Sequence, residues 1–334
     1  MTPPLVSILI PAFNAARWID ATLRSALAQT WSRIEVVVVD DGSDDDTAAV
    51  VQRCGDSRVR LIRRPHLGSS AAQNEAFRQA RGEFIQRLDA DDLLSADKIS
   101  VQMARMRQTP RAIAVGAWAR FTDDPAAARF RRSASSQDLD PAEWLRRECA
   151  IGLPMLQPGL WLASRELVAA AGPWDERLTL NNDFSYGVRL ILAAERVRFC
   201  GDARLFYRSG NPASLASQRS PAAWRSSLQS IDQGATAMLG HAGDDRMRLA
   251  CANLFQQLAY AACLDAPDVS EEAERRATGL GGGRSAMDGG AVFRLMRNAV
   301  GWRRATGIKA LCYRAGYRRV ADLKSAAFRR GGGW

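Results

Sequence analysis

Short apolar runs alternate with segments of helical periodicity over the first 110 residues. Runs typical of strands lie at 5–14, 34–43, 59–62 and 82–89. Segments whose apolar residues recur at helical spacing separate these runs, at about 18–27, 46–53 and 71–80. The run at 34–39 consists mostly of valine, which is typical of a strand buried on both faces of a parallel sheet. This order predicts an α/β fold with a doubly wound, mainly parallel sheet.

Polar and aromatic residues follow these predicted strands at the points where the strands end. Ligands of open parallel sheets bind outside the carboxyl ends of the strands, and this sequence has Phe13, Asn14, Asp41 and Asp91 there. The turn at 11–14 lacks a Gly-x-Gly-x-x-Gly pattern, which weakens a dehydrogenase interpretation. The phosphates of a nucleotide would then need another partner, which a metal on Asp91 would supply, and the Asp41 carboxylate can accept a hydrogen bond from a base N–H.

The fourth predicted strand runs directly into three carboxylates, Asp89, Asp91 and Asp92. Alternate side chains of a strand point to one side, so we expect Asp89 and Asp91 to project together and to share a divalent cation. Ligands that are all oxygen favour Mg²⁺ or Mn²⁺, whose remaining positions are filled by waters and substrate phosphates. The alternative is an acidic turn in which Asp92 or Ser95 caps the following helix.

The rest of the chain carries further predicted elements. We expect a strand at 111–120, a strand edge and helix at 161–172, and a helix directly after Asn181, Asn182 and Asp183. The structural alternative for Asn182 or Asp183 is a helix cap. Long helical periodicity at 218–265 predicts a helical appendage, and the acidic and glycine-rich stretch at 266–290 predicts a linker.

Three motifs, in this order and at this spacing, resemble the family 2 glycosyltransferases with a GT-A fold. They are Val-Ser-Ile-Leu-Ile-Pro-Ala-Phe-Asn at 6–14, Val-Asp-Asp-Gly-Ser at 39–43 and Leu-Asp-Ala-Asp-Asp at 88–92. The resemblance covers roughly residues 5–217. It implies a GT-A domain at 1–217, in which 1–110 bind a nucleotide-sugar and 111–217 form the acceptor side.

The resemblance implies a role for each matching residue on the donor side. The base of a nucleotide-diphospho-sugar donor (UDP, dTDP or GDP) would lie near Phe13 and Asp41, its ribose and phosphates near Asp89, and a Mg²⁺ or Mn²⁺ cofactor on Asp91. Gln73 stands where the family often has an arginine before the asparagine. The implied donor-binding residues are Pro11, Phe13, Asn14, Asp41, Asn74, Asp89 and Arg208. The alternative for Arg208 is an ordinary surface ion pair.

On the acceptor side the resemblance implies a catalytic base. Family members commonly have a Glu-Asp pair before the helix that follows residue 183, and the Asp is the base. Asp183 matches that Asp, and Asn182 replaces the Glu. Trp174, Asp175 and Asn182 are the implied acceptor-side residues. The implied enzyme is an inverting, metal-dependent, hexosyltransferase-type glycosyltransferase that acts on a saccharide or lipid-linked acceptor in cell-surface polysaccharide or glycolipid assembly.

The formal charge of +10 is concentrated in the last 45 residues, which hold eleven basic residues and one acidic residue. Helical periodicity with arginines and Trp302 at 291–334 predicts a basic amphipathic tail, which lies on an anionic membrane or packs on the protein. No transmembrane or signal pattern occurs, so we expect a cytoplasmic protein, held at the inner face of the membrane if the tail binds lipid. The six scattered cysteines predict neither zinc nor disulfides.

Two other functions fit parts of this pattern. An inactive sugar-nucleotide-binding relative is consistent with Gln73 and Asn182. Nucleic-acid binding is consistent with the net charge, but the predicted sheet region is neutral and contains no nucleic-acid motif, so we expect no nucleic-acid partner.

Overall fold

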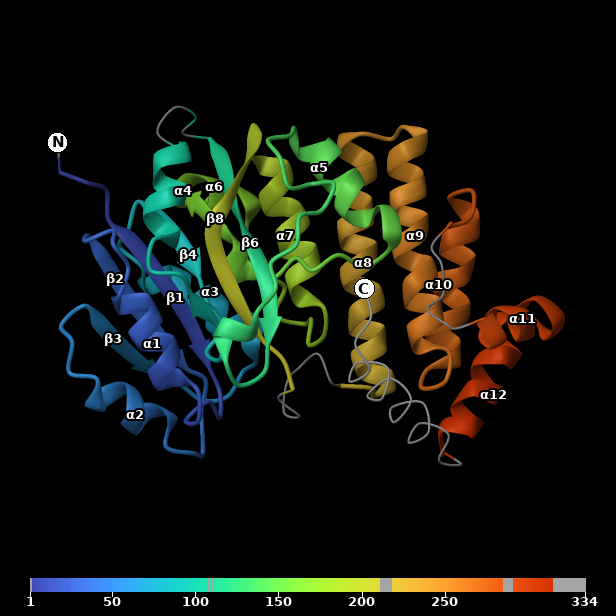
Figure 1. Cartoon of the computed structure of the whole chain (residues 1–334), viewed down its shortest axis with the longest axis horizontal. Helices are drawn as coiled ribbons and strands as arrows, with labels where there is room; N and C mark the ends of the chain where they lie inside the picture. Colours follow the sequence, from blue (N-terminus) through green and yellow to red (C-terminus); the bar gives the residue numbers. More distant parts are fainter. Residues whose placement is uncertain (1, 107–108, 110, 211–217, 285–290, 315–334) are drawn as a thin grey trace, which may run out of the picture.

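The computed structural model describes residues 2–106, 109, 111–210, 218–284 and 291–314. An eight-stranded sheet with helices on both faces forms its centre (Figure 1). The strands are β1 (Val6–Ala12), β2 (Ile34–Asp40), β3 (Val59–Arg63), β4 (Phe84–Arg87), β5 (Leu93–Leu94), β6 (Ala112–Phe121), β7 (Trp161–Ser164) and β8 (Arg196–Arg208). The helices are α1 (Ile19–Leu27), α2 (Thr47–Arg53), α3 (Ser69–Gln79), α4 (Lys98–Met106), α5 (Pro141–Glu148), α6 (Arg165–Ala171), α7 (Asn182–Ala193), α8 (Pro221–His241), α9 (Asp245–Ala262), α10 (Pro267–Gly279), α11 (Ala291–Val300) and α12 (Trp302–Arg314).

The strand order is β3-β2-β1-β4-β7-β6-β8-β5. The first four strands are parallel, as predicted from their continuous apolar runs, whereas β7 pairs antiparallel with both β4 and β6. The chain moves outward from β1 to β3 and then returns to the other side of β1 as β4. The order of strands therefore switches between β1 and β4, which is where open α/β sheets bind ligands.

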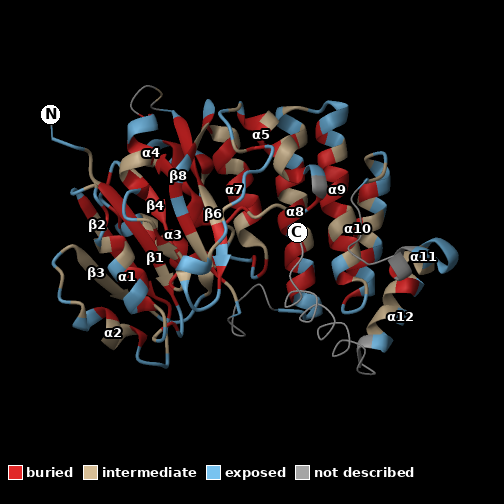
Figure 2. Cartoon of the chain, viewed as in Figure 1, coloured by how far each residue is buried: buried red, intermediate tan, exposed pale blue. Residues whose placement is uncertain are grey.

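The sheet is covered on both faces because its central strands are apolar on both sides. Val36, Val37, Val38 and Val39 of β2 are fully buried. Helix α3 packs on β1 and β2. Figure 2 shows that the buried residues continue from the sheet through α7 into α8 and α9, so one hydrophobic core joins the sheet to the helices that follow it.

The predicted linker at 266–290 is wrong for most of its length. Residues 267–279 form α10, which packs on α9 through the buried side chains of Val269, Ala273 and Ala277. These residues recur every four positions and form one apolar stripe, while the glutamates that indicated a linker lie on the other faces. Gly281 and Gly282 adopt positive φ angles of 100° and 81° and end the helix. Residues 285–290 lie outside the described ranges.

The described part of the predicted basic tail forms two helices, α11 and α12. The Trp302 ring packs edge-on against Tyr260 of α9 at 4.9 Å, and its indole N–H donates to Glu274 of α10 at 3.3 Å. Leu295 and Leu311 nevertheless remain 71% and 65% exposed. Residues 315–334 of the predicted tail lie outside the described ranges. None of the described helices is both long and apolar enough to cross a membrane.

Candidate active site

Three loops meet at the carboxyl ends of β1, β2 and β3. Asn14 adopts a left-handed conformation with φ 48°, and its side-chain oxygen accepts a hydrogen bond from the Asp44 N–H at 3.1 Å. Gly42 has φ 78°, and a Cβ there would lie only 2.6 Å from the backbone nitrogen of His66. The glycine of the predicted Val-Asp-Asp-Gly-Ser motif therefore lets the loop after β3 pack against the loop after β2.

An exposed aromatic pair stands at this edge. Phe13 and His66 stack with ring centroids 4.1 Å apart and planes at 30°. Phe13 is 47% exposed, and the His66 side chain is 53% exposed. The sequence predicted Phe13 as a base-binding residue. His66 was missed, although its position in the loop after the third strand was the available signal.

Asp41 lies beneath this pair and is buried. Its carboxylate accepts the Gly68 N–H at 2.8 Å and pairs with Arg64 at 3.2 Å and with His66 Nδ1 at 2.9 Å. These contacts show that Asp41 organises the loop that carries His66. The predicted hydrogen bond from a base N–H to the Asp41 carboxylate would have to compete with these contacts, so it stays a prediction.

The acidic motif forms a turn after β4 rather than the end of a strand. The Asp92 N–H donates to the Asp89 carbonyl at 3.1 Å, because β4 already ends at Arg87. Thr22 of α1 donates its hydroxyl to the carbonyls of Ala90 and Asp92 at 2.9 and 3.0 Å. The expected strand alternation of Asp89 and Asp91 is therefore wrong, and the turn is what brings the two residues together.

Asp92 has a structural role within this turn. Its buried carboxylate accepts the backbone N–H of Arg208 at 2.8 Å and the side-chain N–H of Gln157 at 2.6 Å. It does not cap the next helix, which begins only at Lys98. Burial and the charges of Asp89 and Asp91 raise the pKa of Asp92 well above its usual value.

Asp183 lies near the acidic turn, although it comes from α7. Burial raises the pKa of Asp89 to about 7, and the negative charges of Asp91 and Asp183 add to this shift. Burial also raises the pKa of Asp183 to about 6. The fold therefore brings the predicted catalytic base and the predicted metal-binding carboxylates into one electrostatically coupled cluster.

The donor set of this cluster fits a hard divalent cation. The described residues contain no group of three or more His, Cys, Asp or Glu side chains that could hold a metal ion. Asp89 and Asp91 would offer carboxylate oxygens alone, which matches Mg²⁺ or Mn²⁺ bound by one or two carboxylates together with substrate phosphates. A bound cation would also relieve the carboxylate repulsion that adds to burial in raising the pKa of Asp89. Asp91 stays the predicted ligand.

Arg208 is buried beside the acidic turn, so the alternative of a surface ion pair is wrong. Its guanidinium carbon lies 4.3 Å from the ring centres of both Trp18 and Phe121. Its Nε donates to the Asp91 carbonyl at 2.8 Å, and its Nη1 donates to the Thr122 carbonyl at 2.9 Å. Arg208 therefore fixes the backbone of the turn, and its predicted contact with a diphosphate stays a prediction.

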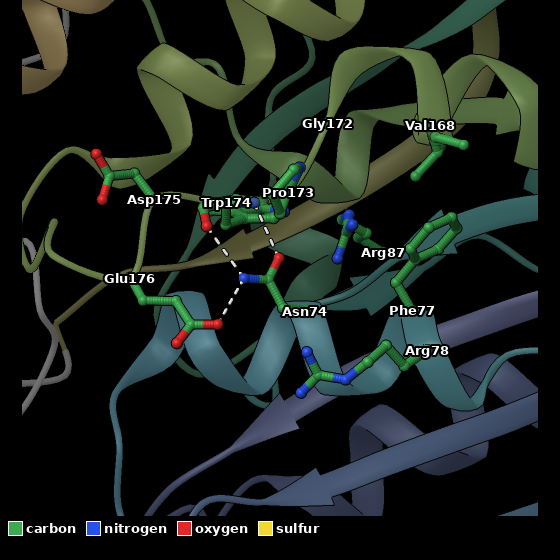
Figure 3. A pocket seen from close by; sticks show the side chains of 11 residues that line it. Asn74, Phe77, Arg78, Arg87, Val168, Gly172, Pro173, Trp174, Asp175 and Glu176 are labelled. Carbon is green, nitrogen blue, oxygen red and sulfur yellow. Dashed lines mark hydrogen bonds between the residues drawn. The ribbon is translucent and has the colours of Figure 1, made fainter.

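Asn74 clamps α3 to the loop before α7 (Figure 3). Its side-chain nitrogen donates to the Trp174 carbonyl at 3.0 Å and to Glu176 at 2.8 Å, and its oxygen accepts the Trp174 N–H at 2.9 Å. The residues around this clamp line a cavity of about 580 Å³ between α3 and α6. Asn74 therefore positions the loop that leads to Asp183, and its predicted donor contact stays a prediction.

The start of α7 is held from two sides. Asn181 is the N-cap residue, with φ 58° and no capping bond from its side chain, so the alternative that Asn182 or Asp183 caps the helix is wrong. The Asn181 carbonyl accepts a hydrogen bond from the Ser230 hydroxyl at 2.6 Å. The Asn182 side chain donates to the Ser70 hydroxyl of α3 at 2.9 Å. Asp183 lies in the first helical turn, where the helix dipole favours its negative charge.

The other predicted acceptor-side residues are engaged within the protein. Trp174 is 3% exposed and stacks on Tyr186 with ring centroids 4.3 Å apart. Asp175 pairs with Arg177 at 2.7 Å and accepts from Gln233 at 2.8 Å. These contacts are structural, and an acceptor role for Trp174, Asp175 and Asn182 stays a prediction.

Buried Arg87 was missed at the sequence level, although it lies two residues before Asp89. It donates to the Gln73 side-chain oxygen at 2.5 Å and to the Tyr186 hydroxyl at 3.2 Å. Its charge lowers the pKa of Asp89 and so opposes part of the effect of burial. The guanidinium of Arg87, at the end of β4, therefore lies against the side chain of Gln73.

Comparison with known proteins adds independent findings. The model of the family described as "Glycosyl transferase family 2" matches residues 7–171. The chondroitin synthase of Escherichia coli is 41% identical over 107 residues, which cover 31% of this chain and 16% of that protein. The E. coli UDP-Glc:alpha-D-GlcNAc-diphosphoundecaprenol beta-1,3-glucosyltransferase WfgD is 40% identical over 103 residues, which cover 30% of this chain and 41% of that protein. The chain thus spans less than two thirds of either relative.

The fold extends the similarity beyond the matched segment. The crystal structure of S. aureus TarS 1-349 in complex with UDP-GlcNAc superposes with a TM-score of 0.61 at 14% identity and covers 93% of this chain and 92% of that chain. The predicted GT-A-like α/β architecture is thereby confirmed.

Proposed function

Residues 7–171 form a family 2 glycosyltransferase domain, and on this premise we propose an inverting, metal-dependent glycosyltransferase of polysaccharide or glycolipid assembly. It would transfer a sugar from a nucleoside-diphospho-sugar to an acceptor hydroxyl. The observation that carries the proposal is the cluster of Asp89, Asp91 and Asp183 at the switch point between β1 and β4, where the charges of Asp91 and Asp183 act on Asp89.

The donor would span the edge of the sheet from the aromatic pair to the acidic turn. The exposed, stacked rings of Phe13 and His66 offer a platform for a nucleobase. The diphosphate would then point toward Asp89 and Asp91, which would share a Mg²⁺ or Mn²⁺ ion with it. The WfgD relative is named for a UDP-Glc donor and the TarS structure holds UDP-GlcNAc, so a UDP-sugar is the first donor to test.

Asp183 supplies the proton acceptor in this proposal. With a pKa of about 6 it is ionised at neutral pH, yet it is basic enough to accept a proton as the acceptor hydroxyl reacts. The hydroxyl oxygen bonds to the anomeric carbon while the bond from that carbon to the diphosphate oxygen breaks, so the configuration inverts. The proton moves to Asp183, and the electron pair of the broken bond stays on the diphosphate. A bound cation would neutralise the departing diphosphate.

Calorimetric titration with UDP-, dTDP- and GDP-sugars, each with and without Mn²⁺, tests donor binding, and a turnover assay then tests transfer. We expect one nucleotide class to bind with Mn²⁺ and to support transfer. The Asp183→Asn protein should bind the same donor but transfer sugar about 10²- to 10⁴-fold more slowly. Binding without turnover on any acceptor would favour the inactive relative, and normal transfer by Asp183→Asn would refute the assigned base.

We also propose that α11 and α12 hold the enzyme on the inner leaflet of an anionic membrane, near a lipid-linked acceptor. Among the described side chains of the two helices, the large apolar ones that are exposed are Leu295, Val300, Ile308 and Leu311. Cationic side chains accompany them at Arg297, Arg304 and Lys309. Each cation near such a surface contributes about 1 kcal/mol. Because Trp302 already packs on Tyr260, the apolar residues that stay exposed are the ones available to lipid.

Vesicle binding tests this membrane proposal. The intact protein should bind phosphatidylglycerol vesicles in a salt-sensitive manner and should not bind phosphatidylcholine vesicles. The double variant Leu295→Glu/Leu311→Glu should lose this binding. Leu264→Glu, which changes a leucine that is 51% exposed just after α9, serves as the matched control and should retain it. If the intact protein does not bind anionic vesicles, the membrane proposal is refuted and α11 and α12 have a packing role alone.

A further inference from the structure

Gln157 joins the acidic turn from a part of the chain that carries none of the predicted motifs. It directly precedes the 3₁₀ turn Pro158–Leu160 and is 3% exposed. Its side-chain nitrogen donates to the Asp89 carboxylate at 3.0 Å and to the Asp92 carboxylate at 2.6 Å. Both N–H groups of one neutral amide are therefore used on two carboxylates of the same turn.

The backbone N–H of Gly159, two residues further along the chain, fixes the orientation of this side-chain amide. The Gln157 side-chain oxygen accepts the Gly159 N–H at 2.5 Å, so the nitrogen must face the carboxylates. A Cβ at Gly159 would lie 2.7 Å from that oxygen and 2.8 Å from Leu205 Cδ1, so only glycine leaves room for the arrangement. A flipped amide would place oxygen against two carboxylates.

A buried polar chain holds the Gly159 backbone in turn. The Gln86 side chain donates to the Gly159 carbonyl at 2.9 Å, and its oxygen accepts from the Lys98 amine at 2.6 Å. Lys98 also donates to Gln102 at 2.7 Å, and Gln102 donates to the Leu160 carbonyl at 3.0 Å. Gln86, Lys98 and Gln102 are fully buried. Satisfied networks of this kind hold one geometry, because each broken bond would leave a buried polar group unpaired.

We propose that Gln157 is a positioning residue that fixes the Asp89 carboxylate for the cation and diphosphate of the donor. The inference rests on the proposed function. A neutral amide suits this position because it orients two carboxylates without cancelling the negative charge that attracts a cation. A lysine or arginine in its place would pair with them and compete with the metal. Groups that orient metal-site carboxylates in this way typically change metal affinity about 10- to 100-fold when they are removed.

The test compares Gln157→Met, which keeps the length of the side chain but removes the amide, with the wild-type protein. Gln79→Met, at an exposed glutamine of α3 whose side chain donates to Glu75, is the matched control. Calorimetry with UDP measures the affinity with and without Mn²⁺. We expect Gln157→Met to bind UDP about 10- to 100-fold more weakly with Mn²⁺ and within about twofold of wild type without it, and Gln79→Met to match wild type throughout.

A lower melting temperature of Gln157→Met with unchanged Mn²⁺-dependent UDP affinity would show a purely structural role and overturn the inference. If Gln157→Met does not fold, Gln86→Met replaces it, because it removes the bond that holds the Gly159 carbonyl and leaves the Gln157 amide in place; it also removes the bonds of Gln86 with Lys98 and the Arg87 carbonyl. Unchanged Mn²⁺-dependent affinity of that variant would overturn the inference equally. Failure of the wild-type protein to bind any nucleoside diphosphate with either cation would instead refute the proposed function, and this inference with it.

Discussion

Replacing the proposed base should make the folded protein more stable while it stops the reaction. Burial raises the pKa of Asp183 from its ordinary 3.8 to about 6. Each unit corresponds to about 1.4 kcal/mol, so keeping Asp183 ionised in the folded state costs about 3 kcal/mol at pH 8. Asp183→Asn removes this cost. The pKa of about 6 already includes the favourable backbone hydrogen bonds at the start of α7, so the expected net gain at pH 8 is about 3 kcal/mol.

The pH dependence of this gain identifies its origin. The folded-state pKa of Asp183 lies above the unfolded value, so the cost is absent below about pH 4, grows as the pH rises to about 6 and is constant above that. The stabilisation by Asp183→Asn should therefore be largest at pH 8 and fall to roughly half at pH 5. Urea denaturation followed by tryptophan fluorescence at both pH values measures the difference in midpoint between the two proteins.

Asp175→Asn is the matched control, because its carboxylate has the opposite environment. The hydrogen bonds from Arg177 hold the pKa of Asp175 well below its usual range, so this substitution should destabilise the protein at pH 8. If Asp183→Asn is no more stable than wild type at pH 8, or if its gain is the same at pH 5, burial of an ionised Asp183 is not what sets its pKa. If the Asp183→Asn protein retains normal transfer activity, Asp183 is not the catalytic base.

Further predictions address the rate, the donor, the cation and the clamp. The rate constant for transfer should fall about tenfold per pH unit below pH 6 as Asp183 is protonated, and a flat profile between pH 5 and 7 would contradict this. Phe13→Ala should weaken nucleotide binding by roughly 1–3 kcal/mol, measured by calorimetry against Phe13→Tyr, if a base stacks on this ring. Mn²⁺ should raise the melting temperature of wild type more at pH 8 than at pH 5, and should leave Asp91→Ala unchanged. Asn74→Ala should lower the unfolding free energy by roughly 1–3 kcal/mol in urea titrations, because the buried Trp174 N–H and carbonyl lose their partner.

The parallel half of the sheet was predictable because its signals are local. A strand buried on both faces shows as a continuous apolar run, as in β2, and its end shows as the first polar residue after the run. The carboxyl ends of parallel strands share one edge, so Phe13, Asp41 and Asp91 were placed at that edge before their contacts were known. Asp41 and Asp91 are nevertheless separated by β1, because β4 returns to the far side of β1.

Features that depend on remote contacts were not predictable. The antiparallel insertion of β7 between β4 and β6 depends on pairing between segments far apart in the chain. Gln157 has no neighbouring motif, and its partners Asp89 and Asp92 lie far from it in the sequence. The glutamates and glycines at 271–283 resembled a linker. The buried stripe of α10 is short, and it is buried only because α10 packs against another helix, α9, which the sequence pattern of α10 does not reveal.

The contacts of the acidic turn explain how a cluster of carboxylates persists in a folded protein. Burial, with the charges of Asp91 and Asp183, destabilises the ionised form of Asp89 and raises its pKa to about 7. The turn is held by the Thr22 hydroxyl on two carbonyls, the Arg208 backbone N–H on Asp92, and the Gln157 amide on Asp89 and Asp92. These three groups are neutral donors and fix the geometry without cancelling the charge, whereas the side chains of Arg208 and Arg87 offset part of it. A divalent cation would neutralise the remaining negative potential, so the repulsion between the carboxylates would favour binding of the cation and, through it, of the anionic diphosphate of the donor.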